Sequence, residues 1–171
     1  MLVDRSKTID LYHTTDEGSN WYAVRKILGD MHKEIHRHLK MGKSSRMALR
    51  VFNSERVTTL MSLKDSLGYE AGQNKINSEL LQTPFSKSSA NELIFEAVRE
   101  AVNEFKSDAR NIDTGLRATQ CIVLFTDAKE LNDAERTLDI LKAQMDKNVY
   151  VLVIGKCSHK LAAVFHLAET N

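Results

Sequence analysis

The stretch that decides the fold is Ile122-Val-Leu-Phe-Thr-Asp127, a run of bulky apolar residues that ends in a threonine and a carboxylate. A short, continuously apolar run is typical of a strand that is buried on both faces of a parallel sheet. The carboxyl ends of such strands meet at one edge of the sheet, where α/β proteins place their binding sites. Asp127 is therefore expected at that edge.

A second segment with the same ending lies far upstream, in Thr8-Ile-Asp-Leu-Tyr-His-Thr-Thr-Asp16. We predict that this segment forms the first strand and that residues 1–7 are a flexible or partial N-terminal segment. Two carboxylates that arrive from two strands, Asp16 and Asp127, indicate a cation, because hard divalent cations prefer carboxylate oxygens. The sequence thus predicts a cation site at the carboxyl edge of the sheet.

Length and composition limit the class of protein. The chain has 171 residues, 42% of them hydrophobic and 27% charged, which predicts a single globular domain over residues 1–171. The formal net charge is +1 and charges of both signs are interspersed, so bulk charge predicts no binding to nucleic acid or to an anionic membrane. No apolar run approaches the roughly 20 residues of a membrane helix, and we expect no membrane insertion.

Strand and helix patterns alternate along the chain. Apolar residues at helical spacing predict helices over 21–39, 74–81, 93–105, 133–145 and 159–168. Strands are predicted over 8–16, 46–52, 57–63, 121–127 and 149–155, with one hairpin between 46–52 and 57–63. This order predicts an α/β fold with a doubly wound, mostly parallel sheet, one antiparallel edge strand, and helices on both faces.

Several of these segments resemble a von Willebrand factor A domain, the Rossmann-like fold that integrin I domains share. The resemblance is carried by Asp10-Leu-Tyr12, Trp21, Val51-Phe52, Thr58-Thr-Leu60, Val123–Asp127 and Val153-Ile-Gly155. Within the family, the chain is most similar to domains of the anthrax-toxin-receptor and apicomplexan adhesin kind. Family members usually add a sixth strand and a final helix, so we expect a fold that lacks these last two elements.

The resemblance implies a metal-ion-dependent adhesion site at the carboxyl edge. The family pattern is Asp-x-Ser-x-Ser after the first strand, a threonine in the loop before the helix that starts here near Ala90, and an aspartate after the fourth strand. Carried onto this chain, it gives these metal ligands: Asp16, Ser19, Ser89 and Asp127, with Asn20 and Ser88 as alternatives. Gly18 and Ala128 depart from the pattern, so the site is expected to be degenerate.

Another segment, Asp4-Arg-Ser-Lys-Thr8, matches Asp-x-Ser-x-Thr literally. Only three residues precede it, and no predicted helix follows it. We therefore interpret it as a chance match and place the site at Asp16.

The resemblance also implies what the domain does. We expect recognition of a protein ligand, for adhesion or for assembly of a matrix or cell surface, in an extracellular or cell-surface setting. The resemblance implies Mg²⁺, or Mn²⁺ or Ca²⁺, bridging to an acidic side chain of the partner; without a working site, binding would need no cation. The alternative is an intracellular, cytoplasmic scaffold domain. A third candidate, a Mg²⁺-dependent hydrolase, lacks a nucleophile, so we do not expect an enzyme. The sequence indicates no oligomeric state.

Histidines on the helix over 21–39 offer a different metal site. His32 and His36 are spaced i,i+4 and could share a zinc ion. Their neighbours Lys33, Arg37 and Lys40 favour a solvated helix face instead.

Overall fold

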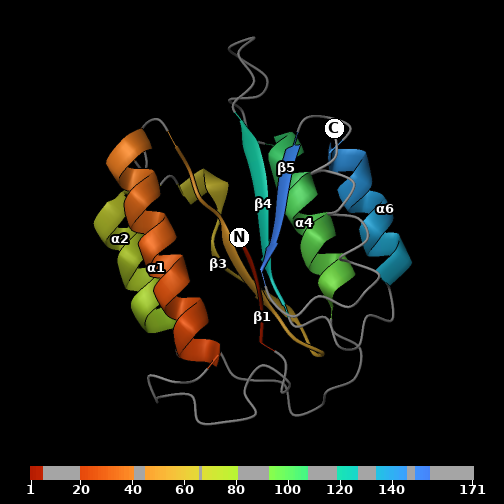
Figure 1. The fold of residues 1–171 in the computed structure, drawn as a ribbon, viewed down its shortest axis with the longest axis horizontal. Helices are drawn as coiled ribbons and strands as arrows, with labels where there is room; N and C mark the ends of the chain where they lie inside the picture. The colour runs from red at the N-terminus through yellow and green to blue at the C-terminus, as the bar shows by residue number, and fades with distance from the viewer. Residues whose placement is uncertain are drawn as a thin grey trace.

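The structure, a computed structural model, describes residues 1–5, 20–40, 45–65, 67–80, 93–107, 119–126, 134–145 and 149–154. These residues form a sheet of five strands with helices packed on both of its faces (Figure 1). The strands are β1 (Leu2–Asp4), β2 (Leu49–Phe52), β3 (Val57–Met61), β4 (Gln120–Phe125) and β5 (Val149–Ile154).

The sheet is mostly parallel. Its strand order is β3-β2-β1-β4-β5. The central strand β1 runs parallel to β2 and β4, and β4 runs parallel to β5. Only β3 is antiparallel, to β2, and it lies at one edge. The predicted α/β class with one antiparallel edge strand is confirmed.

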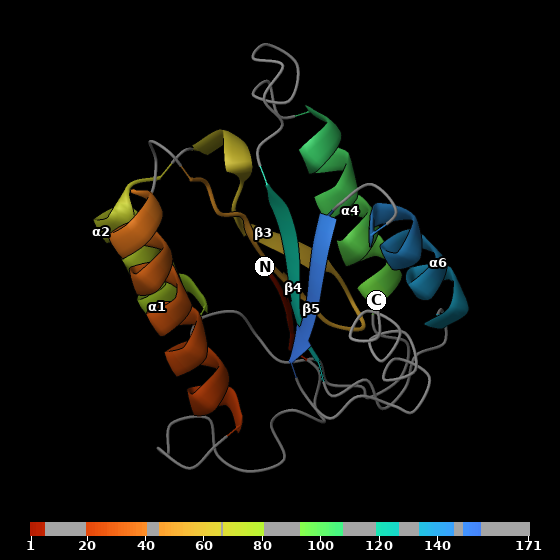
Figure 2. The same cartoon turned by 45° about the horizontal axis from the view of Figure 1, so that its top comes forward.

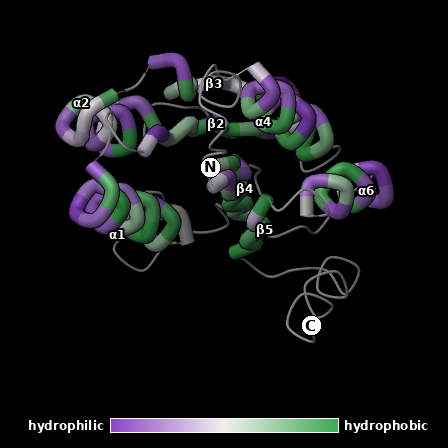
Figure 3. The backbone as a smooth tube through the Cα atoms, turned by 90° about the horizontal axis from the view of Figure 1, so that it is seen from above, coloured by the Kyte–Doolittle hydropathy of each residue, from purple (hydrophilic) through white to green (hydrophobic). Residues whose placement is uncertain are grey.

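The helices form two layers, one on each face of the sheet. They are α1 (Asn20–Leu39), α2 (Tyr69–Asn74), the π-helix η2 (Lys75–Glu79), α4 (Ile94–Ser107) and α6 (Ala134–Met145), with a short 3-10 turn η1 (Leu63–Asp65). Seen from above, α1 and α2 lie on one side of the strands and α4 and α6 on the other (Figure 3). None of the helices in the described ranges combines the length and apolar character needed to cross a membrane.

A hydrophobic core fills the space on each side of the sheet. Successive residues of a strand point to opposite faces, so each strand contributes to both cores. The α1 side receives Val3, Val123 and Phe125, and the α4 side receives Leu2, Ile122 and Leu124. Burial on both faces explains why β4 reads as a continuous apolar run.

The first strand corrects one prediction. Residues 1–7 were expected to be a flexible or partial segment, yet Leu2, Val3 and Asp4 are 1%, 0% and 0% exposed and form the central strand. A strand with neighbours on both sides and helices on both faces gains its stability from these neighbours, so three residues suffice. The strand predicted over residues 8–16 lies outside the described residues.

Most other elements agree with their predicted positions within a few residues. Three predicted helices correspond to observed ones: 21–39 to α1, 93–105 to α4 and 133–145 to α6. Two predicted strands do so as well: 121–127 corresponds to β4 and 149–155 to β5. The helix predicted over 74–81 begins earlier, at Tyr69, and continues as η2. The predicted helix over 159–168 lies outside the described residues. Turned by 45°, the molecule shows α2 beside α1 and α4 beside α6 (Figure 2).

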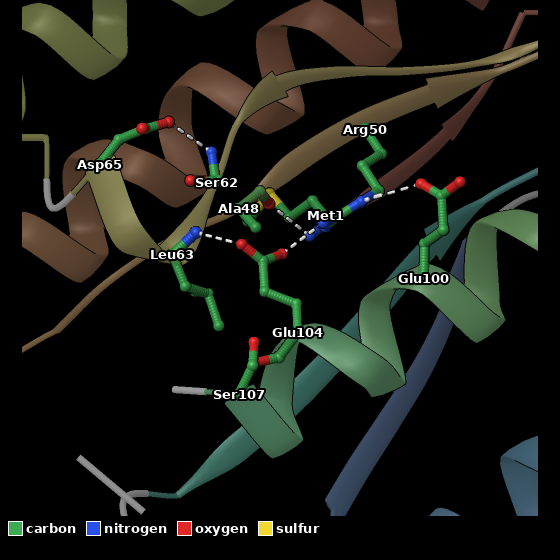
Figure 4. Close-up of polar contacts among 9 residues, drawn as sticks. All are labelled: Met1, Ala48, Arg50, Ser62, Leu63, Asp65, Glu100, Glu104 and Ser107. Carbon is green, nitrogen blue, oxygen red and sulfur yellow. Dashed lines mark hydrogen bonds and ion pairs between the residues drawn. The ribbon is translucent and has the colours of Figure 1, made fainter. Parts of the chain in front are cut away.

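A buried ion pair joins the sheet to α4 at the amino ends of the central strands. Arg50 of β2 and Glu104 of α4 lie 2.5 Å apart, and their side chains are 8% and 9% exposed. Glu104 also accepts a hydrogen bond from the backbone of Leu63 at 2.5 Å. A second carboxylate, Glu100, lies 3.6 Å from Arg50 and is 46% exposed. Figure 4 shows Arg50 between the two glutamates.

Candidate functional site

The candidate site lies where the parallel strands end. Asp4 is the last residue of β1 and pairs in register with Phe52, the last residue of β2. Val3 pairs with Phe125, the last residue of β4, so the next residues, Asp4 and Thr126, are neighbours across the two strands. The central strand thus delivers a carboxylate to the edge that α/β folds use for binding.

Asp4 and Thr126 are joined directly. The Thr126 hydroxyl Oγ1 donates a hydrogen bond of 2.7 Å to Oδ2 of Asp4. Both residues are buried, with 0% and 2% exposure. Burying a carboxylate is costly unless it has polar partners, and a hydroxyl bound to a charged acceptor makes a strong hydrogen bond. Thr126, the residue directly after β4, therefore helps to hold the Asp4 carboxylate in position.

Backbone hydrogen bonds extend the sheet one residue beyond the strand ends. The Arg5 amide donates to the carbonyl of Phe52 at 2.8 Å, and the Thr126 amide donates to the carbonyl of Ile154 at 3.1 Å. Both bonds fix the direction in which the chain leaves β1 and β4. The residues that follow in sequence, from Ser6 and from Asp127, therefore start from this edge.

The start of α4 is tied to the same edge. The Asn53 side chain, just after β2, accepts hydrogen bonds from the amides of Glu55 and Arg56 at 2.8 and 2.9 Å, as asparagine does in turns. The Asn53 carbonyl accepts a hydrogen bond of 3.1 Å from the amide of Leu93. Leu93 directly precedes α4, so the chain that comes from Ser88 and Ser89 enters this helix next to the end of β2.

The predicted ligands mostly cannot be placed. Asp16, Ser19, Ser88, Ser89 and Asp127 lie outside the described residues. Asn20 begins α1, but the position of its side chain is not described. The role of these six residues as metal ligands therefore stays a prediction.

The sequence interpretation did not place Asp4 at the carboxyl edge, although this residue ends the central strand there. The segment Asp4-Arg-Ser-Lys-Thr8 was taken as a chance match because only three residues precede it. The three preceding residues are no argument against the match, since Leu2 and Val3 form the central strand and Asp4 ends it. The signal was present in the literal Asp-x-Ser-x-Thr match that follows the apolar pair Leu2-Val3.

The donor atoms at this edge suit a hard cation. Asp4 contributes a carboxylate and Thr126 a hydroxyl, and oxygen ligands of this kind favour Mg²⁺ or Mn²⁺ over zinc. Within the described ranges, no three His, Cys, Asp or Glu side chains gather closely enough to hold a metal ion on their own. A cation at this edge would need ligands in addition to Asp4.

The histidines of α1 differ from their predicted environment. His32 was expected on a solvated helix face, but it is 0% exposed. Its ring stacks on Tyr69 of α2 with the centroids 5.3 Å apart, and the His36 ring stacks on the same tyrosine at 4.7 Å. Tyr69 of α2 covers the face of α1 that carries these two rings. The charged residues next to the histidines in sequence do not show that another helix packs there.

Comparisons with known proteins support the fold. No protein-family model and no curated protein sequence matches the chain. Among solved structures, a manganese-loaded TRAP protein from Plasmodium vivax is similar, with a TM-score of 0.65 and 22% sequence identity over 90% of this chain. The chain spans 54% of the length of that protein. Together with the strand order and the two helical layers, this likeness shows that the chain has a von Willebrand factor A-like fold.

Proposed function

We propose that this chain is a recognition domain for a protein ligand, used in adhesion or in the assembly of a matrix or cell surface. It binds through the carboxyl edge of the sheet. The observation that carries the proposal is the buried Asp4 carboxylate, held by the Thr126 hydroxyl at 2.7 Å where the parallel strands end. The likeness in fold to the TRAP protein supports the same conclusion.

The proposed site contains a divalent cation, Mg²⁺ or Mn²⁺. Asp4 takes the place that the sequence interpretation gave to Asp16, because Asp4 ends the strand that lies beside β4. In sequence, Ser6 and Thr8 complete Asp-x-Ser-x-Thr, and Asp127 follows Thr126 directly. Ser89, or Ser88, would supply the hydroxyl from the loop before α4. A bound cation would offer a coordination position to an aspartate or glutamate of the partner.

The proposed activity is binding, without chemistry on the partner. Thr126 orients the Asp4 carboxylate, and neither residue needs to act as a nucleophile or a base. Cys121 is an exposed thiol, but partial desolvation of the thiol raises its pKa, which disfavours the thiolate that attacks substrates. The hydrolase alternative is therefore not proposed.

Calorimetry with Mg²⁺ and Mn²⁺ tests the cation and its ligands together. Wild type and the Asp16→Asn variant should both bind Mn²⁺. Asp4→Asn should bind at least about tenfold more weakly, since a lost charged contact is worth roughly 1.5–3 kcal/mol. Asp127→Ala should weaken binding in the same way. Loss of Mn²⁺ binding in Asp16→Asn alone would place the cation at Asp16 and contradict a role for Asp4. The absence of binding heat in wild type would contradict the cation site altogether.

One observation favours a second candidate, a scaffold domain inside the cell. Cys121 is a free thiol, and unpaired thiols are common in reducing compartments, although a domain of this size needs no disulfide outside the cell either. Protease treatment of intact cells that express the tagged, full-length protein separates the two settings. Cleavage of the domain on intact cells is expected for adhesion, whereas protection until the cells are lysed would favour the scaffold.

A further inference from the structure

The contact between α1 and α2 is built around a buried imidazole. His32 is fully buried and lies against Gly72 of α2 so closely that a Cβ at Gly72 would sit 2.5 Å from its Nε2 atom. Tyr69, one turn earlier on α2, stacks on the same ring with an angle of 9° between the planes. Gln73 adds a hydrogen bond of 3.1 Å from its side-chain amide to the carbonyl of Gly29 on α1. His32 is thus sealed between the two helices.

Both nitrogen atoms of this ring lack a hydrogen-bond partner within the described part of the chain. A neutral imidazole has one N–H donor and one acceptor nitrogen, whereas the protonated ring has two donors and a positive charge. Burying an unpaired polar group costs about 1–3 kcal/mol, and burying an unpaired charge costs more. The closed contact therefore tolerates the neutral ring and disfavours the charged one.

Within the described ranges, no carboxylate contributes to the pKa of His32. On α1, the charge of His36 lowers the pKa of His32, and on α2, the Tyr69 ring stacks on both histidines. Glu70 of α2 is exposed, and on η2, Lys75 and Glu79 pair with each other.

The sheet beneath this contact is apolar, with Leu49, Val51 and Met61 in the same core as Leu28 of α1. Burial, and secondly the charge of His36, lowers the pKa of His32 below its ordinary value of 6.5. No carboxylate among the described residues raises it. Protonation of the His32 ring therefore favours opening of the contact between α1 and α2.

We propose that His32 is a pH switch that releases α2 and η2 from α1 when it is protonated. The sign follows from the protonation states. In the open state His32 is solvated and binds a proton more readily than in the closed state, so the closed state is fully stable above the ordinary histidine pKa. It loses stability as the pH falls through that value toward the lower pKa of the closed state. The device is separate from the carboxyl edge and does not depend on the proposed cation.

Hydrogen exchange measured by mass spectrometry at about pH 7.5 and about pH 5 tests the switch, after correction for intrinsic exchange rates. In wild type, the segment from Tyr69 to Leu80 should lose protection at the lower pH, by at most about tenfold for each pH unit below the ordinary histidine pKa of 6.5. Peptides from α4 and β4 should change less. Equal protection of the segment at both pH values would overturn the proposal.

Matched variants assign the effect to one histidine. His32→Leu, which is neutral at both pH values, should abolish the pH-dependent loss, whereas His38→Gln, at an exposed position of the same helix, should retain it. A loss that persists in His32→Leu would contradict the proposal. Should that variant fail to fold, the imidazole of His32 in wild type can be titrated by NMR. A midpoint below the ordinary histidine value of 6.5 is expected, and an equal or higher midpoint would overturn the switch.

Discussion

The Thr126 hydroxyl donates a hydrogen bond to the Asp4 carboxylate at the end of the central strand. Thr126→Val keeps the shape of the side chain but leaves Asp4 without this donor, so we expect the free energy of unfolding to fall by about 1.5–3 kcal/mol. Urea unfolding monitored by circular dichroism measures the change. Thr59→Val, at an exposed position on β3, is the matched control and should change stability by less than about 0.5 kcal/mol. Equal effects of the two variants would contradict the importance of the Thr126 contact.

The ion pair between Arg50 and Glu104 stabilises the opposite end of the sheet. Glu104→Gln leaves the buried Arg50 guanidinium without its close carboxylate, and breaking such a buried pair costs about 3–5 kcal/mol. Glu100→Gln removes the partner at 3.6 Å that is 46% exposed, and should cost no more than about 1 kcal/mol. The midpoints of urea unfolding of the two variants report the difference. A larger loss in Glu100→Gln would show that the pair with Glu104 is not the main contact of Arg50.

At the scale of elements, substitutions of two helical glycines, Gly72 and Gly29, distinguish the effect of packing on stability from the effect of helix propensity. Gly72→Ala gains about 1 kcal/mol of propensity, but its Cβ would lie 2.5 Å from His32. Since overpacking costs about 1–3 kcal/mol, we expect a net loss of up to about 2 kcal/mol. At Gly29 the nearest atom to a new Cβ is 3.8 Å away, so Gly29→Ala should stabilise by about 0.5–1 kcal/mol. Thermal unfolding of both variants measures these shifts, and stabilisation by Gly72→Ala would show that His32 moves freely.

The elements differ in how far the sequence predicts them. The helix α1 and the strand β4 were predictable, because a long apolar stripe and a run buried on both faces are strong local signals. The strand β1 was not, since three residues carry no periodicity and its stability comes from β2, β4 and the two cores. The π-helical turn of η2 has no sequence signal of its own either. Local pattern thus predicts elements that are long or fully apolar, and misses those that depend on their neighbours.

At the scale of the whole molecule, the alternation of strands and helices was enough to predict the architecture. Connections between parallel strands must cross a face of the sheet, so this alternation places helices on both faces and brings the strand ends to one edge. The site was predictable only to that edge. Which aspartate ends the first strand depends on which short segment takes the centre of the sheet. Asp4 directly follows Leu2-Val3, whereas Asp16 follows the longer segment Thr8–Thr15.

The most direct test of a cation site at the end of β1 locates the cation without any substitution. Mn²⁺ is paramagnetic and broadens the NMR signals of nearby amides, so substoichiometric Mn²⁺ added to the labelled protein reports where it binds. With a cation at the end of β1, the amides of Arg5, Asn53 and Thr126, at the carboxyl edge, should broaden first, while those of Leu49 and Gln120, at the amino ends of their strands, should stay sharp. Broadening centred on the histidines of α1, or no selective broadening at all, would contradict a cation site at the end of β1.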